Sequence, residues 1–549
     1  MSTNIIGELA NASKALTAHR FGVTTAGNNM ANVNNPDYAR QRVVIGEDGY
    51  VQTVGGPRGL GVQVQGFEHM RDAVLDREIL RETSLNASLT SQQSALAKAE
   101  SSLGQEITRA GDSPFIDGAT ANGGGSGGIA ETLNNFFNAF HSLSANPGSD
   151  AEKESLIQKA DILTEKLNVT AERFGDLHDD IGLQVTTDLG QANQMIEEIA
   201  RLNSEIARAE SGGAGQALSL RDQRQGVLED LSEIMQVRVE EIPESAGQIR
   251  VYVPTIGGDA PQLDLVERGR FQKVDFIDTT GPNPNYQFVV GDDQIRIDVK
   301  SGSIEGALTA RDGAIAEYRR GLDGFAKELV TAVNAIYNQG ASTAAIAAAN
   351  ISGELGVPIS ASVIQAGIAA DNSGATPAEI AAAMIDAQAT TNGVVVPSVE
   401  EIETSVSGRL DFFDPSTTTA TTIRLASGLN SSTLRTTGEL DQNKGDNSLA
   451  LAIAELDDDR LAGLGNRDFA SYYRSVVTNL GENVAKVDAR LEDETIVFDM
   501  LKQQQESVSG VSLDEEMTDM MKYQRAFEAT GKLIRAIDEM LDVIVNRLV

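Results

Sequence analysis

Residues 1–31 read MSTNIIGELANASKALTAHRFGVTTAGNNMA, and their spacing decides the fold of the chain ends. Apolar or small side chains recur at alternating steps of four and three residues: Ile5, Leu9, Ala12, Leu16, His19, Val23, Ala26 and Met30. This heptad repeat places one stripe along a single face of an α-helix. Because such a stripe is buried only against a partner, the segment predicts a helix that pairs.

The C-terminal end mirrors this pattern. Ser512 and Glu515 have the spacing of a capping box, which would satisfy the first free amides of a helix. A four–three rhythm follows, and it resumes after Gly531: Leu513, Met517, Met520, Gln524, Phe527, Ile534, Ile537, Leu541, Ile544 and Leu548. We therefore expect the two ends to pair with each other as a coiled-coil-like rod.

A second helical pair is predicted just inside the first. One apolar seam runs from Leu85 to Leu103, and another from Val484 to Val508 within a helix that begins near Asn466. The segment VSGVS (508–512) predicts a joint between two helices. A further helical stretch is capped by Ser149 and Glu152 and is expected to run, with interruptions, to about Glu210.

The middle of the chain changes character. From Val237 the pattern alternates in VRVEEI, QIRVYV, FQKVDFI, YQFVV and QIRIDV, with Gly, Pro and Asn turns between them. This predicts an antiparallel β-domain. Helix is expected again over 315–337, and an Ala-rich, outward-facing insertion over 341–408. RLDFFDP and TTIRLA then suggest short strands.

Together these patterns predict an α+β fold, elongated and multidomain, with a central antiparallel β-domain and an Ala-rich inserted module. The expected domains are a terminal axial helical domain (1–70 plus 510–549), a helical shaft (71–235 plus 311–340 and 441–509), the β-domain (236–310) and the inserted outer module with short strands (341–440).

Composition excludes several classes of function. The net charge is −36, from 80 acidic against 44 basic residues, so nucleic acid and anionic membrane surfaces are disfavoured as partners. No apolar run approaches the roughly 18 residues that span a bilayer. Residues 1–20 have no basic leader and apolar core of a cleaved signal peptide. Cysteine is absent, which removes disulfides and thiol chemistry.

No catalytic or metal site can be argued from residue spacing. His19, His69, His141 and His178 have no second histidine at ligand spacing, and no nucleophile set emerges. The acidic clusters 457–459 and 515–516 are expected to be solvated surface. We therefore predict no enzyme activity, no cofactor and no metal.

Residues 29–41, NMANVNNPDYARQ, resemble the N-terminal motif shared by axial proteins of the bacterial flagellum. Asn side chains cap helix ends, Pro36 stops the helix, and Tyr38 supplies an apolar anchor with a polar tip. Two positions depart from the usual pattern: Asn35 stands where Thr is common and Asp37 where Gly is common.

Three further stretches resemble the FlgK-type hook-associated proteins. They are GPRGLGVQVQGFEHMRDAVLDREI (56–79), residues 303–340, and SGVSLDEEMTDMMKYQRAFEATGKLI (509–534). They occur in the order expected for that family, whereas 236–310 and 341–408 carry little resemblance to it.

The resemblance implies a structural protein that joins the flagellar hook to the filament as a ring or short tube. Its implied partners are the hook protein, a second hook-associated protein on the filament side, further copies of itself, and a cytoplasmic export chaperone at the C-terminal helices. It implies an extracellular location, reached without signal-peptide cleavage. The candidate assembly residues are Asn29, Asn32, Pro36, Tyr38 and Gln41, with Leu513, Met517, Tyr523, Gln524 and Phe527.

Other hypotheses remain open from the sequence. The chain could be another axial protein, such as hook or distal rod. The terminal heptads could form an ordinary intramolecular coiled coil. The central domain could carry an enzyme, or the outward module could act as an adhesin, although no residue pattern supports either.

Overall fold

The computed structural model describes residues 2–53, 56–103, 128–212, 217–243, 245, 247–256, 262–278, 286–291, 293–339, 411–436 and 447–547. These residues are mostly helical with small antiparallel sheets, so the predicted α+β class is confirmed. The chain forms two compact units. Unit 1 comprises Met1–Gln92, Leu183–Leu308 and Asp488–Val549, and unit 2 comprises Gln93–Gly182 and Thr309–Val487.

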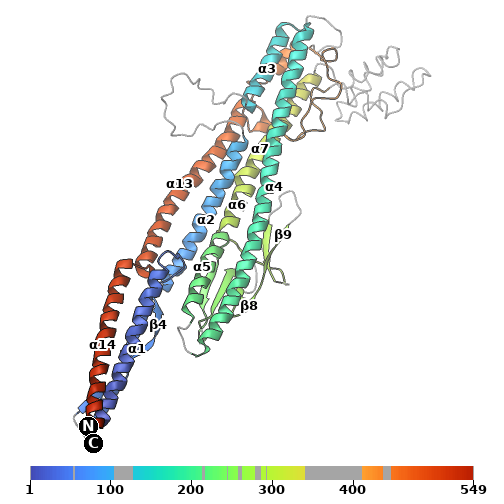
Figure 1. Ribbon diagram of the computed structural model, residues 1–549. Helices are drawn as coiled ribbons and strands as arrows, with labels where there is room; N and C mark the ends of the chain where they lie inside the picture. Colours follow the sequence, from blue (N-terminus) through green and yellow to red (C-terminus); the bar gives the residue numbers. More distant parts are fainter. Residues whose placement is uncertain are drawn as a thin grey trace. The chain divides into compact units, whose positions relative to one another are not determined.

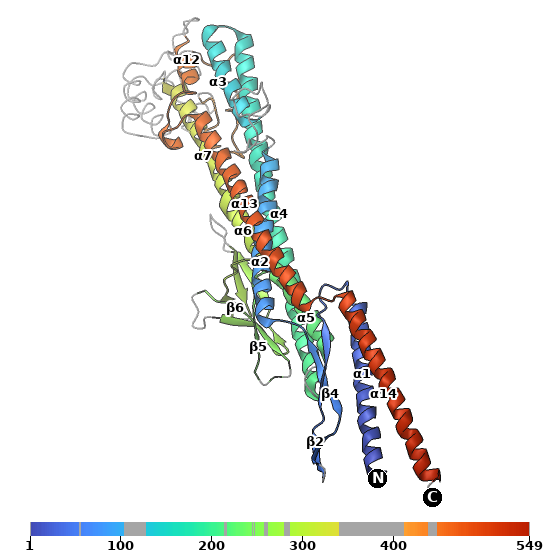
Figure 2. The same ribbon diagram turned by 90° about the vertical axis from the view of Figure 1, so that its left-hand side faces the viewer.

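In unit 1 the helices at the two ends of the chain, α1 (Ser2–Ala31) and α14 (Leu513–Arg547), lie side by side and antiparallel (Figure 1, Figure 2). The buried face of α1 carries small side chains, Ala12, Ala18, Gly22 and Ala26. The coiled-coil geometry of the pair stays a prediction.

The first half of α14 meets α1 by a face that differs from the predicted stripe. Glu516 is buried there and Tyr523 is half-buried, whereas Leu513 and Met517 are half exposed (49% and 50%). Further along the helix, Ile537 of the predicted stripe is buried. The small residues of α1 explain the difference, because they admit a large ring where a heptad seam would place an aliphatic side chain.

A β-ribbon lies beside α1, in a part of the chain predicted to be helical. It consists of β1 (Gln41–Glu47), β2 (Tyr50–Thr53), β3 (Gly56–Gly59) and β4 (Val62–His69), with β1 paired to β4 and β2 to β3. Phe67 of β4 meets Phe21 of α1 edge-on, with ring centroids 5.7 Å apart. Apolar and polar residues alternate in QRVVIGE and VQVQGFEH, and this alternation is typical of strands. The prediction missed it because the neighbouring chain ends have a strong helical repeat.

The central strands of unit 1 form two antiparallel sheets. One has the order β5-β6-β7-β8: Arg238–Glu241, Ile249–Pro254, Gln262–Glu267 and Arg270–Phe271. The other has the order β11-β10-β9: Ile295–Arg296, Tyr286–Val290 and Val274–Asp278. Strand β7 was not anticipated. Helix α5 (Leu218–Ile234), the 3₁₀ turn η1 (Glu210–Gly212) and most of helix α6 (Ser303–Ala310) also belong to this unit.

Three long helices contribute residues to both units: α2 (Ala73–Ser102), α4 (Asp150–Ala209) and α13 (Phe469–Ser509). Helix α4 is continuous, so the predicted interruptions are wrong. Its start is capped as predicted, because the Glu152 amide donates to the Ser149 hydroxyl at 3.3 Å. The joint between α13 and α14 falls within the predicted 508–512 segment.

Unit 2 also contains α3 (Ile129–Ala145), the π-helical turn η2 (Arg311–Ile315), α7 (Ala316–Gln339), α12 (Ser448–Glu455) and η3 (Ala462–Leu464). Its core is aromatic: Phe136, Phe137, Phe140, Phe412, Phe413 and Phe469 are fully buried. The predicted short strands appear as a single antiparallel bridge between Phe413 and Leu425.

Two of the sequence predictions fall elsewhere. The Ala-rich insertion over 341–408 and most of the glycine-rich loop near 123–128 lie outside the described residues. In the described ranges, none of the helices has the length and apolar character needed to cross a membrane.

Candidate assembly interface

The N-terminal motif folds around the side chain of Asn29, which is 1% exposed near the end of α1. Its carbonyl oxygen accepts hydrogen bonds from the Tyr38 hydroxyl (2.7 Å) and the Gln41 amide (3.0 Å). Its side-chain NH₂ donates to the Gln41 carbonyl (2.9 Å). Three of the predicted residues, Asn29, Tyr38 and Gln41, therefore meet in one network.

The same network reaches the start of α14 through Glu516. One carboxylate oxygen of Glu516 accepts a 2.9 Å bond from Asn29, and the other accepts a 2.6 Å bond from Nε of Arg40. Arg40 also bonds the Glu515 carboxylate (2.7 Å), and its backbone amide donates to the Ser509 carbonyl (2.9 Å). The turn after α1 is thus fastened to the joint between α13 and α14.

The expectation that 515–516 is solvated surface is wrong for Glu516, which is 2% exposed. A buried carboxylate is tolerated when both oxygens are paired, and here a cation and an amide pair them. Sequence reasoning missed both Glu516 and Arg40. Residue type alone offered no signal, because the two lie on segments that meet only in the folded chain.

Tyr38 is held as a neutral hydrogen-bond donor. Burial raises the pKa of its hydroxyl to about 12, and the negative charges of Asp222 and Glu516 add to the effect. The hydroxyl therefore stays protonated across physiological pH and continues to donate to Asn29.

The remaining residues of the motif lie nearer the surface. The Asn32 side chain donates to the Asn28 carbonyl (2.9 Å) at the end of α1, and Pro36 is exposed. Asp37 does not need the positive φ that glycine would allow, since the described non-glycine residues with positive φ are Arg268, Gln294 and Asn466. Its side chain packs closely on Gly226 of α5 instead. The Asp37 carboxylate carbon would lie only 2.7 Å from a Cβ added to Gly226.

His69, isolated in the sequence, contacts Asp222 of α5 with Nε2 and Oδ2 3.4 Å apart. Nη2 of Arg71 donates to the other Asp222 oxygen (3.1 Å) and to the Asp37 carbonyl (2.8 Å). These contacts tie the β-ribbon and the N-terminal turn to α5. No sequence pattern predicts them.

A cleft of about 620 Å³ opens beside the motif, between the C-terminal half of α1 and the start of α5. Amide and aromatic side chains dominate its lining: Phe21, Asn28, Asn32, Tyr38, Gln41 and Phe67. Asp222 is the buried acid on its wall. This lining suits contact with polypeptide.

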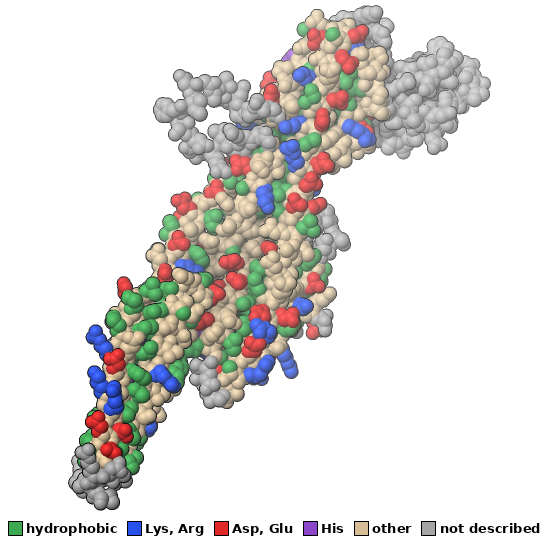
Figure 3. Space-filling view, in the orientation of Figure 1, with side chains coloured by type: hydrophobic (Ala, Val, Ile, Leu, Met, Phe, Trp, Pro, Cys, Tyr) green, Lys and Arg blue, Asp and Glu red, His purple; other side chains and the backbone are tan. Residues whose placement is uncertain are grey.

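The five predicted residues of α14 divide between two faces. Tyr523 lies over Gly22 of α1, where an added Cβ would be 2.5 Å from the ring, and its centroid is 6.4 Å from that of His19. Leu513, Met517 and Phe527 are 49%, 50% and 38% exposed, and Gln524 is exposed. Figure 3 shows hydrophobic side chains gathered along α14.

Family models match two segments of this chain. The FlgK helical domain of the flagellar hook-associated protein matches residues 116–351, and the C-terminal domain of the flagellar basal body rod proteins FlgEFG matches residues 502–548. Flagellar hook-associated protein 1 of Salmonella typhimurium is 23% identical over 98% of this chain and 99% of its own length. The Bacillus subtilis protein of the same name is 24% identical over 100% and 99%.

Over almost its whole length the chain is similar to flagellar hook-associated protein 1. The fold agrees with the structure of the flagellar hook junction protein FlgK from Burkholderia pseudomallei, which superimposes with a TM-score of 0.52 at 13% identity, covering 79% of this chain and all of that one. The FlgK match at 116–351 includes the β-domain, so the expectation that 236–310 carries little resemblance was wrong.

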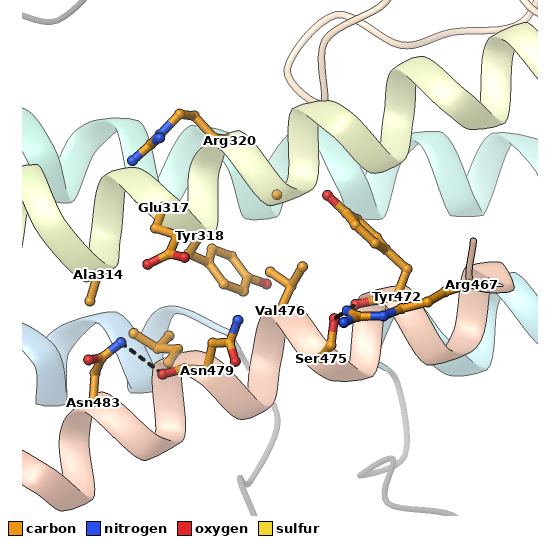
Figure 4. A pocket seen from close by; sticks show the side chains of 12 residues that line it. Ala314, Glu317, Tyr318, Arg320, Arg467, Tyr472, Ser475, Val476, Asn479 and Asn483 are labelled. Carbon is orange, nitrogen blue, oxygen red and sulfur yellow. Dashed lines mark hydrogen bonds between the residues drawn. The ribbon is translucent and has the colours of Figure 1, made fainter. Parts of the chain in front are cut away.

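The relatives that this chain resembles are structural flagellar proteins. A pocket of about 270 Å³ in unit 2 lies between α7 and α13 (Figure 4). It has one lining carboxylate, Glu317, while Arg467 donates to the Ser475 hydroxyl at 2.7 Å. Across the described ranges, no three His, Asp or Glu side chains are grouped as they would be around a metal ion.

Proposed function

We propose that this chain joins the flagellar hook to the filament and assembles through its terminal helices as a ring or short tube. The observation that carries the proposal is the buried Asn29–Glu516–Arg40 network, which fixes the turn after α1 against the joint before α14. Asn29 and Arg40 belong to one segment that resembles flagellar axial proteins, residues 29–41, and Glu516 belongs to another, residues 509–534. A fixed joint would let each copy present its terminal helices at the same angle.

The outward face of α14 supports contact with neighbours. Leu513, Met517 and Met521 recur at four-residue steps and are each about half exposed. On the last turns of α13, Ile496, Val497 and Met500 are 57%, 46% and 65% exposed. Large apolar side chains that recur on one helix face favour burial against another protein.

We propose the following partners for these surfaces: the hook protein, a second hook-associated protein on the filament side, and further copies of this chain. A cytoplasmic chaperone would cover the C-terminal helices before export without signal-peptide cleavage. The terminal pair would then act as a coiled-coil-like rod, with Asn32, Pro36, Gln524 and Phe527 at its surface. The location would be extracellular, on the flagellum.

Deleting the protein from its own cells tests this function. Hooks should still form, filaments should fail to attach, and flagellin should appear in the medium. Attached filaments in the deletion strain would overturn the proposal. Restoring the unaltered chain is the control, and it should return filaments to the hooks.

A second candidate is another axial protein, hook or distal rod. The match of residues 502–548 to the C-terminal domain of the rod proteins supports this candidate. Immunogold labelling of intact flagella separates the two. Label between hook and filament supports the junction role, whereas label along the hook or below it supports the alternative.

A further inference from the structure

The turn between β7 and β8 carries an arginine in a strained backbone conformation. The two strands pair Glu267 with Arg270, so Arg268 and Gly269 form a two-residue turn. The favoured turns of this length need a positive φ at their first residue, which glycine, asparagine and aspartate adopt most easily. Arg268 occupies that position with a φ of 57°. A strained residue that the fold retains indicates a role for its side chain.

Buried groups fix this turn to α4, beside which β8 is labelled in Figure 1. The side chain of Asn203, which is 0% exposed, donates 2.8 Å hydrogen bonds to the carbonyls of Arg268 and Ile249. Its carbonyl oxygen accepts a 2.7 Å bond from the guanidinium of Arg224, which is itself buried. The turn is therefore held rigidly, and a rigid turn loses little conformational entropy when it binds a partner.

The side chains around the turn form a basic patch, which consists of Arg268, Arg270 and Lys273. All three residues are exposed, and within the described ranges none of their side chains forms an ion pair or a hydrogen bond. Of the seven consecutive exposed residues ERGRFQK (267–273), three are basic and one is acidic. Phe271, which is 36% exposed, lies among the cations. This composition contrasts with the whole chain, which has 80 acidic and 44 basic residues.

Protection of the sheet edge explains only part of this patch. Strand β8 is the outer strand of its sheet, and charged side chains on such a strand prevent sheets from aggregating edge to edge. That role accounts for Arg270 and Lys273, which lie on β8 and just after it. It does not account for Arg268, because glycine would form the turn without strain.

We infer that the basic patch docks on an acidic surface of a second polypeptide chain in the flagellum. The inference rests on the proposed function and deepens it by naming the chemistry of one contact. Complementary charge selects an acidic partner, and the ring of Phe271 adds apolar contact area. An extended polyanion, such as an anionic membrane, is disfavoured because a chain of net charge −36 repels it. Carboxylates on a protein surface can meet the patch locally.

Zero-length crosslinking tests this contact, because a carbodiimide joins a lysine to a carboxylate only where the two side chains touch. Isolated flagella that contain the full-length chain are treated with the reagent, and mass spectrometry identifies the coupled peptides. Arg268→Lys and Arg270→Lys extend the readout to the other two positions of the patch. The free chain, treated in the same way, is the control for each lysine.

In flagella, Lys273 and both introduced lysines should be coupled to aspartate or glutamate of another chain, whereas in the free chain they should stay uncoupled. Uncoupled lysines in flagella that contain the chain would overturn the inference, as would coupling only within one chain. Binding of the free chain to phosphatidylglycerol vesicles that Arg268→Gly abolishes would overturn the choice of a polypeptide partner. If the unaltered chain is absent from isolated flagella, the proposed function fails as well.

Arg268→Gly separates a docking role from a structural one. It should lower the yield of the Lys273 crosslink several-fold, because a cation is lost, and it should not lower Tm, because the positive φ is relieved. Gln294→Gly is the matched control, since Gln294 is also exposed with a φ of 50° and carries no charge. The control should leave the crosslink yield unchanged. Equal yields in the two variants would overturn the role of Arg268.

Discussion

The side-chain amide of Asn29 donates a 2.9 Å hydrogen bond to the carboxylate of Glu516, which lies 487 positions further along the chain. Both side chains are buried, at 1% and 2% exposure. The bond connects the end of the first helix with the start of the last. It makes the two chain ends one structural element.

Replacing Asn29 with Ala should destabilise the terminal helices by about 3 kcal/mol, because several buried polar groups and one carboxylate would lose a partner together. Amide hydrogen exchange in α1 and α14 measures this change. Asn32→Ala is the control. Its side chain bonds the Asn28 carbonyl at an exposed position, so its loss should stay below about 1 kcal/mol. Equal effects of the two substitutions would contradict the central role of Asn29.

Gly22→Ala should loosen the contact between α1 and α14. The added methyl would lie 2.5 Å from the Tyr523 ring, and overpacking of this kind costs about 1–3 kcal/mol. Gly7→Ala is the matched control within the same helix, because its added Cβ meets nothing within 4 Å. The control should stabilise α1 slightly, since alanine favours helix more than glycine does.

A double variant distinguishes the clash from a backbone effect. Tyr523→Leu removes the ring and should recover most of the stability that Gly22→Ala loses, as measured by thermal unfolding. If the double variant is as unstable as the sum of the two single changes, Tyr523 is not the neighbour that requires glycine.

Stability should fall as the pH rises from about 4.5 to about 7. Burial and the hydrogen bond with Glu82 raise the pKa of Glu494 from its ordinary 4.5 to about 7. Between these values the folded chain holds a proton that the unfolded chain has released. This contribution is therefore complete below pH 4.5 and is lost by pH 7.

Urea unfolding of the wild type and of Glu494→Gln across this range measures the effect. The wild type should lose stability relative to the variant as pH rises, and Glu492→Gln, at an exposed position of the same helix, should behave as wild type. A constant difference between wild type and Glu494→Gln at every pH would contradict the shared proton.

Met517→Glu should lower incorporation into flagella without lowering the stability of the free chain. Met517 is 50% exposed, so a charge there is solvated in the free protein but would be desolvated at a subunit contact. Ile162→Glu on α4, at 46% exposure, makes the same kind of change away from α14. Quantitative blotting of isolated flagella should show loss for the first variant and wild-type amounts for the second.

Sequence periodicity predicted the terminal helices, the joint at 508–512 and most of the central strands, because each depends on local spacing. It missed the ribbon β1–β4, whose alternation in QRVVIGE and VQVQGFEH is short and follows a long helical repeat. Among the candidate residues, Asn29, Tyr38 and Gln41 belong to one motif, so their proximity was foreseeable. The contact between Arg40 and Glu516 could not be foreseen, because a local sequence pattern predicts that a charged residue lies on the solvated surface.

The sequence by itself determined the helical ends, the acidic and cysteine-free surface, and the resemblance to flagellar axial proteins. These follow from composition and from hydrophobic steps within single segments. Only the tertiary structure decided which face of α14 meets α1, and that Glu516 is buried while Met517 is exposed. The reason is steric and electrostatic. Small residues on α1 select the partner face, and a buried charge is stable only where a distant Arg40 and Asn29 can reach both of its oxygens.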